Sequence, residues 1–147
     1  MAAAMEEAKR AYARDEVPIG AVLVDPATGK IAARAGNETI ARHDPTAHAE
    51  ILVIREVCEQ QSAQRIPGYD LYVTLEPCAM CAAAISFARI RRVIFAACDP
   101  KGGAILHGPK FFEQPTCHHR AQILPGPRAE DASQILKDFF KQKRIKE

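Results

Sequence analysis

The stretch that decides the fold runs from residue 71 to residue 97 and has the sequence LYVTLEPCAMCAAAISFARIRRVIFAA. Its two ends, 71–75 and 92–97, are rich in β-branched, aromatic and apolar residues, which is typical of buried strands. The alanine-rich segment 78–88 between them favours a helix, and Pro77 suits its start because the first helical turn leaves its N–H groups unpaired. A strand, a helix and a second strand predict a parallel pair in an α/β sheet.

The rest of the chain extends this unit on both sides. Periodicity and turn residues indicate a helix over 2–14, strands over 19–24 and 30–35 joined by the turn 25–29, a helix over 47–61, a long loop over 99–118, a strand over 121–124 and a helix over 129–144. We therefore expect an α/β fold: a three-layer α/β/α sandwich with a mixed central sheet of about five strands, formed by a hairpin followed by parallel strands with crossover helices. The length fits a single domain over residues 1–147.

Composition places the chain among ordinary proteins without a membrane span. Hydrophobic residues make up 48% and charged residues 26% of the sequence, and no apolar stretch is long enough to cross a bilayer. The start does not resemble a signal peptide, and the five cysteines include a pair at metal spacing, so we expect a reducing, cytoplasmic location.

The net charge of +2 does not by itself indicate a nucleic-acid binder, although Arg89, Arg91 and Arg92 cluster. At least one of these arginines is expected to pair with a carboxylate.

Two short motifs carry the chemistry of the chain. His48 supplies an imidazole, and Cys78 and Cys81 supply two thiols three residues apart, a spacing that lets both reach one metal ion. Their place just after Pro77 puts them at a helix N-terminus, where the helix dipole favours the thiolate form. Three protein ligands leave a fourth position for water, so the pattern predicts a catalytic Zn²⁺ site.

Glu50, two residues after His48, completes the pattern H-x-E…P-C-x-x-C, which is the signature of zinc-dependent nucleobase deaminases. We expect this carboxylate to stand beside the water and to move its proton during a hydrolytic deamination. A structural zinc site with four protein ligands is an alternative, since the fourth ligand could come from any of several residues. These are Cys58, Cys98, Cys117, His43, His107, His118 and His119.

Longer segments around these motifs resemble the bacterial tRNA-specific adenosine deaminases, a family within the cytidine deaminase-like superfamily. The segments that carry the resemblance cover nearly the whole chain and are 16–24, 42–51, 71–78, 89–93, 99–104 and the Phe139-Phe140 helix. The resemblance implies conversion of the wobble adenosine in a tRNA anticodon, chiefly that of an arginine tRNA, to inosine. It also implies a homodimer in which each anticodon loop touches both subunits. The chain departs from the family's pattern between residues 105 and 118.

The resemblance also implies roles for individual residues. The zinc ligands would be His48, Cys78 and Cys81, and Glu50 would be the catalytic proton shuttle. The substrate-binding residues would be Asn37, which contacts the base or ribose of the target nucleotide; Glu76 and Pro77, whose turn helps to hold the zinc water through backbone contacts; and Asp99 and Lys101, which contact the anticodon loop beside the flipped nucleotide. From the residues alone, Glu76 is also a candidate for orienting the metal loop.

Two other functions compete with RNA deamination. The same zinc chemistry could act on a free nucleobase or nucleoside such as cytosine, guanine or cytidine, but Lys101 and Lys110 in the long loop favour a phosphate-bearing substrate. A zinc-stabilised RNA-binding module without turnover would have no need of Glu50. A target amine stacked inside a duplex cannot reach the metal, so a single-stranded loop is the expected RNA substrate.

Overall fold

Five strands form one sheet in the computed structural model, which describes residues 1–146. The strands are β1 (Gly20–Val24), β2 (Ile31–Gly36), β3 (Asp70–Leu75), β4 (Arg92–Ala97) and β5 (Gln122–Pro125), and their order in the sheet is β2-β1-β3-β4-β5. β1 pairs antiparallel with both β2 and β3, whereas β3, β4 and β5 are parallel. The mixed five-stranded sheet that the sequence predicts is therefore confirmed.

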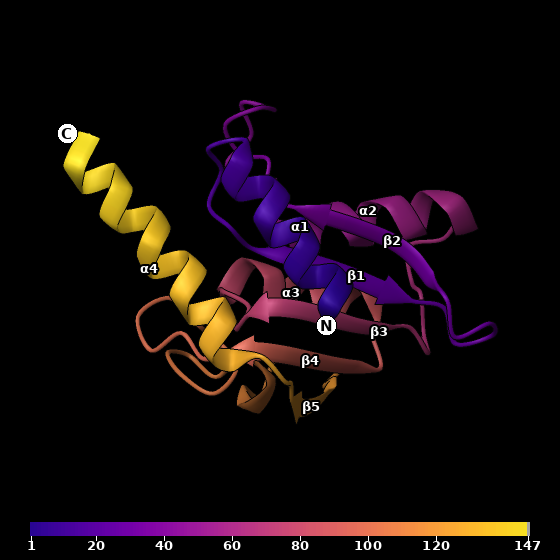
Figure 1. Cartoon of the computed structure of the whole chain (residues 1–147). Helices are drawn as coiled ribbons and strands as arrows, with labels where there is room; N and C mark the ends of the chain where they lie inside the picture. Colours follow the sequence, from indigo (N-terminus) through magenta and orange to yellow (C-terminus); the bar gives the residue numbers. More distant parts are fainter. Residues whose placement is uncertain (147) are drawn as a thin grey trace.

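Helices cover both faces of this sheet. They are α1 (Ala2–Ala13), α2 (Ala49–Gln61), α3 (Ala79–Ala88) and α4 (Ala129–Lys146). Figure 1 shows α1 and α4 in front of the sheet and α2 and α3 behind it, which confirms the three-layer sandwich. None of these helices combines the length and the apolar character that crossing a bilayer would require.

The two parallel connections differ from each other. α3 links β3 to β4 as expected, but the segment between β4 and β5 contains only a single turn of 3₁₀-helix, η1 (Phe111–Glu113). The expectation of a crossover helix is therefore wrong for this second connection, while the expected long loop is confirmed. Glycines and prolines explain the difference, because five of them fall within residues 102–115 and interrupt any helical run.

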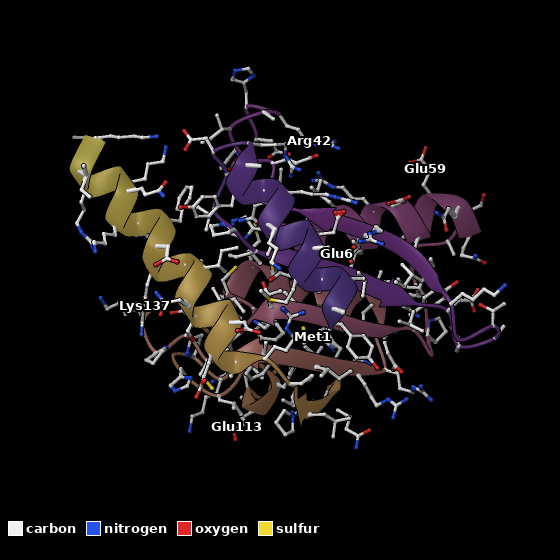
Figure 2. The ribbon with its side chains drawn as sticks, in the orientation of Figure 1. Met1, Glu6, Arg42, Glu59, Glu113 and Lys137 are labelled. Carbon is white, nitrogen blue, oxygen red and sulfur yellow. The ribbon has the colours of Figure 1, made fainter. Side chains whose placement is uncertain are left out.

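The main core lies between the sheet and the pair α2 and α3. Val53, Leu71, Ile85 and Val93 are among its fully buried side chains, while charged residues such as Glu59 and Lys137 point outward (Figure 2). On the opposite face α1 packs almost directly on β1. A Cβ atom at Gly20 would lie 1.9 Å from the carbonyl oxygen of Ala4 in α1, so only glycine permits this approach.

This architecture brings the starts of two helices to one edge of the sheet. β3 and β4 are parallel and pair Leu75 with Ala97, so the segments that follow both strands leave the sheet at the same edge. α3 begins at this edge, and α2 packs against α3. The edge formed by the carboxyl ends of parallel strands is the usual ligand-binding position in α/β proteins.

Candidate metal centre and active site

Three side chains form a metal-binding cluster at this edge. His48 is the residue just before α2, and Cys78 is the residue just before α3, while Cys81 lies in the first turn of α3. The Nδ1 atom of His48 lies 3.7 Å from Sγ of Cys78 and 3.6 Å from Sγ of Cys81. Zinc bonds of about 2.3 Å to sulfur and about 2.05 Å to nitrogen in a tetrahedral arrangement would place sulfur and nitrogen about 3.6 Å apart. The cluster therefore fits a zinc ion held by Nδ1 and two thiolates.

The local backbone differs slightly from the sequence prediction. His48 and Cys78 were expected within the first helical turns, but both have extended backbone conformations, with ψ angles of 151° and 176°. An extended residue at a helix start directs its side chain away from the helical turn, and this frees both ligands from the helical periodicity. His48 therefore reaches the metal position from outside the helix that carries Glu50.

The two thiols differ in acidity. Hydrogen bonding from the Cys81 thiol, together with that from His48 and the Cys81 backbone N–H, outweighs burial and lowers the pKa of Cys78 to about 4. The pKa of Cys81 is raised, first by its hydrogen bond with Cys78 and then by burial and the nearby charges. One thiolate thus forms readily, and a bound cation would supply the positive charge that stabilises the second.

A fourth protein ligand is absent from this cluster. Across residues 1–146, His48, Cys78 and Cys81 are the only group of at least three His, Cys, Asp or Glu side chains whose ligand atoms lie within 4.8 Å of one another. The alternative donors named from the sequence therefore lie elsewhere; Cys117, for example, contacts Ser86 in the core, and the ring of His119 contacts the Ile90 carbonyl oxygen. The cluster has the open coordination of a catalytic rather than a structural zinc site.

Glu50 lies in the first turn of α2 and is only 4% exposed. Burial is the main reason why its pKa is raised; the charge of Cys78 raises it further, while His48 and a hydrogen bond with Cys81 oppose the shift. These interactions place the carboxyl group beside the metal cluster. A carboxyl group with a raised pKa is suited to accept a proton and to return it near neutral pH.

Asn37 joins β2 to the start of α2. Its Oδ1 atom accepts a hydrogen bond of 2.8 Å from the backbone N–H of Ala49, the first residue of the helix, and the side chain is buried. This bond satisfies one of the unpaired N–H groups at the helix start. Because the oxygen is engaged, the amide nitrogen of Asn37 is oriented as the free donor.

Glu76 and Pro77 connect β3 to the cysteine turn. The carboxylate of Glu76 is fully buried and accepts hydrogen bonds from Asp99, Ile105, Leu106 and His107. Burial alone would raise the pKa of Glu76, but these hydrogen bonds lower it below its ordinary value. Since both oxygens are engaged in this way and the N–H of Glu76 donates to the carbonyl oxygen of Ala97, Glu76 has only its backbone carbonyl group left for contact with a substrate.

Asp99 and Lys101 lie just after β4, on the same edge as the metal cluster. Oδ1 of Asp99 accepts hydrogen bonds from the backbone N–H groups of Lys101 and Gly102, which closes a tight turn. The side chain of Lys101 is exposed. Both residues line a groove of about 710 Å³ whose other wall includes Lys137 and Arg144 of α4.

Comparison with known proteins identifies the family. Residues 1–97 match the model of the cytidine and deoxycytidylate deaminase zinc-binding region. A tRNA-specific adenosine deaminase of Agrobacterium fabrum is 57% identical over 145 residues, which covers 99% of this chain and 94% of that protein. The chain belongs to the tRNA-specific adenosine deaminase family.

Solved structures agree with this family assignment. A structure from studies of A-to-I editing by tRNA:A34 deaminases at the wobble position superimposes with a TM-score of 0.89 and 57% identity, and covers 92% of this chain and 97% of that one. A guanine deaminase of Bacillus subtilis is more distant, with a TM-score of 0.64, 29% identity and coverage of 97% and 89%. The fold is therefore that of cytidine deaminase-like enzymes, and its zinc-binding region contains the cluster described above.

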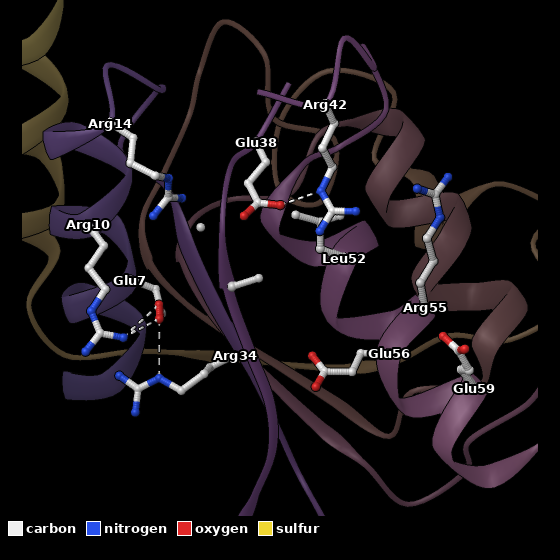
Figure 3. A pocket seen from close by; sticks show the side chains of 12 residues that line it. Glu7, Arg10, Arg14, Arg34, Glu38, Arg42, Leu52, Arg55, Glu56 and Glu59 are labelled. Atoms are coloured by element: carbon white, nitrogen blue, oxygen red, sulfur yellow. Dashed lines mark hydrogen bonds and ion pairs between the residues drawn. The ribbon is translucent and has the colours of Figure 1, made fainter. Parts of the chain in front are cut away.

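Many arginines on the surface of this protein form ion pairs with carboxylates. Arg91 and Arg92 both bind the carboxylate of Asp70 at the start of β3, the end of the strand remote from the cluster, which confirms the expected structural pairing. A hollow of about 570 Å³ lies between α1, β2 and α2, and Figure 3 shows that both arginines and glutamates line it. Arg10 and Arg42 pair there with Glu7 and Glu38, so this hollow is an ion-paired surface separate from the metal centre.

Two residues near the site make contacts that no sequence pattern predicts. His107 was considered only as a possible zinc ligand, but its ring contacts Glu76 at 2.8 Å. Glu16, with 1% exposure, accepts hydrogen bonds from the N–H groups of Ile40 and Ala41 and so anchors the loop between Asn37 and His48. Each of these contacts spans more than 20 residues, and neither has a spacing that a sequence pattern could reveal.

Proposed function

We propose that this protein hydrolyses the wobble adenosine of a tRNA anticodon to inosine. The observation that carries the proposal is the three-ligand cluster with Glu50 buried beside it, in a chain that is 57% identical to a tRNA-specific adenosine deaminase. In this reaction the oxygen of water adds to C6 of adenine, the bond from C6 to the exocyclic nitrogen breaks, and ammonia leaves. Adenosine and water are thus consumed, and inosine and ammonia are formed.

The residues divide the chemistry between them. His48, Cys78 and Cys81 would hold zinc, and the chemistry that zinc supplies when bound is acidification of a water molecule at the open position. Glu50 would take one proton of that water to the ring nitrogen, and it would then carry the second proton, from the hydroxyl group added at C6, to the departing amine. Its burial near the cluster supports this role, because a carboxyl group with a raised pKa transfers protons in both directions near neutral pH.

Substrate binding falls to residues around the cluster. The amide nitrogen of Asn37 would donate a hydrogen bond to the base or ribose of the target nucleotide, and the engagement of its Oδ1 atom by Ala49 supports this role. The backbone of Glu76 and Pro77 would help to hold the water, while Asp99 and Lys101 would contact the nucleotides beside it. An exposed lysine suits this task, since cationic contacts to phosphates position an RNA without reading its sequence.

An assay on matched substrates tests the proposal. For an anticodon stem-loop with adenosine at the wobble position, we expect kcat/KM to exceed that for free adenosine, cytidine or guanine by at least about 10³-fold, because contacts with remote nucleotides contribute to the reaction. Inosine is measured by nuclease digestion and chromatography. The same stem-loop with guanosine at the wobble position serves as the blank. Turnover of free bases or nucleosides alone would instead support a nucleobase deaminase, the second candidate that the resemblance to a guanine deaminase favours.

The finer parts of the proposal concern the substrate's identity and its place in the cell. We propose an arginine tRNA as the main substrate, the cytoplasm as the location and residues 1–147 as one catalytic domain. All five cysteines are free, which agrees with a reducing compartment. All five strands belong to one sheet, and the four α-helices cover its two faces, which supports a single domain.

We also propose that the protein acts as a homodimer. Phe87 near the end of α3 is 64% exposed in the single chain, so its apolar ring is available to a second copy. A Phe87→Asp substitution should convert a dimer to a monomer, because it places a charge in an apolar contact. Light scattering coupled to gel filtration measures the mass, and Phe140→Asp on α4 is the matched exposed control. If the Phe87→Asp variant is still a dimer, α3 is not part of the interface.

A further inference from the structure

The carboxylate of Glu76 gathers an unusual number of donors from one short loop. Oε1 accepts a hydrogen bond of 3.1 Å from the N–H of Asp99 and contacts Nδ1 of His107 at 2.8 Å. Oε2 accepts three bonds of 3.0–3.2 Å from the N–H groups of Ile105, Leu106 and His107. All five contacts come from residues 99–107, and the Glu76 side chain has no exposed surface.

The loop backbone is shaped closely around this carboxylate. A Cβ atom at Gly103 would lie 2.5 Å from the carboxyl carbon of Glu76 and 2.6 Å from the carbonyl oxygen of Asp99, so no larger residue fits without moving the loop. Gly103 also donates its N–H to that carbonyl oxygen at 2.8 Å. The loop has one further backbone anchor on the cysteine turn, from the N–H of Ala104 to the carbonyl oxygen of Pro77.

The donor pattern requires an ionised acceptor with two equivalent oxygens. Backbone N–H groups point at both oxygens, and a carboxylate accepts at both. A glutamine side chain has nearly the same shape, but its amide nitrogen would face an N–H donor instead of an acceptor. Glu76→Gln therefore weakens the attachment of the loop at one end while preserving the volume of the side chain.

We propose that Glu76 is a positioning residue for RNA, which holds the loop 99–107 in its binding conformation before the substrate arrives. The loop carries Asp99 and Lys101 at its outer side, and it contains no strand or α-helix of its own to maintain their positions. Order present before binding lowers the entropy lost on binding, so affinity for RNA depends on Glu76 more than the chemical step does. The inference rests on the proposed function, in which RNA is the substrate.

Glu76→Gln tests the proposal through a split between KM and kcat. With an anticodon stem-loop as substrate, we expect KM to rise by about 10- to 100-fold, a size typical of misplaced binding groups, while kcat changes by less than about threefold. Zinc content should stay at the wild-type level. Amide hydrogen exchange should become faster in residues 99–107 and remain unchanged in the strands of the sheet.

A second variant examines the same loop without altering a neighbour of the metal ligands. Gly103→Ala forces a Cβ atom against the Glu76 carboxylate and should give the same rise in KM and the same faster exchange. The double variant should be no worse than the stronger single one, because both changes disrupt one contact. If Glu76→Gln loses zinc, Gly103→Ala decides the question by itself.

Asp70→Asn is the matched control. Asp70 is a buried carboxylate at the opposite end of β3, and it is held by Arg91 and Arg92 rather than by loop backbone. This variant should lower the thermal midpoint of unfolding without raising KM for RNA. An equal rise in KM in Asp70→Asn, or an unchanged KM in both loop variants, would overturn the proposal. Failure of the wild-type protein to deaminate the stem-loop would instead refute the proposed function. The wild-type protein is assayed first, so this outcome is known before any variant is compared.

Discussion

Replacement of Glu50 with alanine is expected to abolish inosine formation while zinc remains bound. Removal of a general acid and base commonly lowers a rate by about 10²–10⁴-fold, and Glu50 would serve at both proton transfers, so we expect a loss at or above the upper end of this range. The three proposed zinc ligands are untouched by the change. Single-turnover assays on an anticodon stem-loop measure the rate, and atomic absorption measures the metal.

The fold of this variant should be at least as stable as that of the wild type. A buried carboxyl group has lost much of its hydration, and burial is the main cause of the raised pKa of Glu50. Its removal relieves that cost, which is typical of residues retained for function rather than for stability. Glu56→Ala, an exposed position on the same helix, is the control and should retain full activity. Activity retained in Glu50→Ala would exclude Glu50 from the proton transfers.

Replacement of Cys78 with serine is expected to remove both the metal and the activity. A serine hydroxyl does not ionise near neutral pH, whereas the surroundings of Cys78 lower its pKa to about 4 and so maintain a thiolate. The variant loses one of three ligands, and His48 and Cys81 alone make a weak zinc site. We expect less than about a tenth of the wild-type zinc content, and an activity lower by at least about 10³-fold.

Two measurements separate loss of metal from loss of structure in this variant. Circular dichroism should show that the helices and the sheet persist, because the core cluster between the sheet and α2 and α3 includes none of the three proposed ligands. Cys58→Ser, at a half-buried position of α2 outside the cluster, should bind zinc as the wild type does. Full zinc occupancy in Cys78→Ser would contradict the assignment of Cys78 as a ligand.

The sequence predicts most of the secondary structure because each element is specified by neighbouring residues. The apolar run 92–97 is strand β4 in the structure, and the turn chemistry at 25–29 does separate β1 from β2. Local rules fail at the helix starts, where His48 and Cys78 adopt extended rather than helical backbone conformations. The two helices begin one or two residues later than their periodicity suggests, because the extended backbone of each of these residues precedes the first helical turn.

Spacing alone was enough to name the proposed metal ligands, but it did not exclude a structural zinc site with four protein ligands. Seven further cysteines and histidines remained possible fourth ligands until their positions in space were known. Only the structure separates Cys117 and His119, which contact the core beside α3, from the cluster at the edge of the sheet. Coordination number is a property of three-dimensional proximity, and residues distant in sequence determine it.

The amino-acid sequence by itself determined the chemistry of this protein: an imidazole, two thiols and a carboxylate in the order of a zinc deaminase, within an α/β fold. Such chemistry depends on residue types and short spacings, which the chain specifies locally. Only the tertiary structure decided how the site is supported, with Asn37 bound to the start of α2 and Glu76 enclosed by the loop 99–107. These contacts join side chains to backbone groups 12 and 29 residues away, and a backbone N–H carries no signature in the sequence.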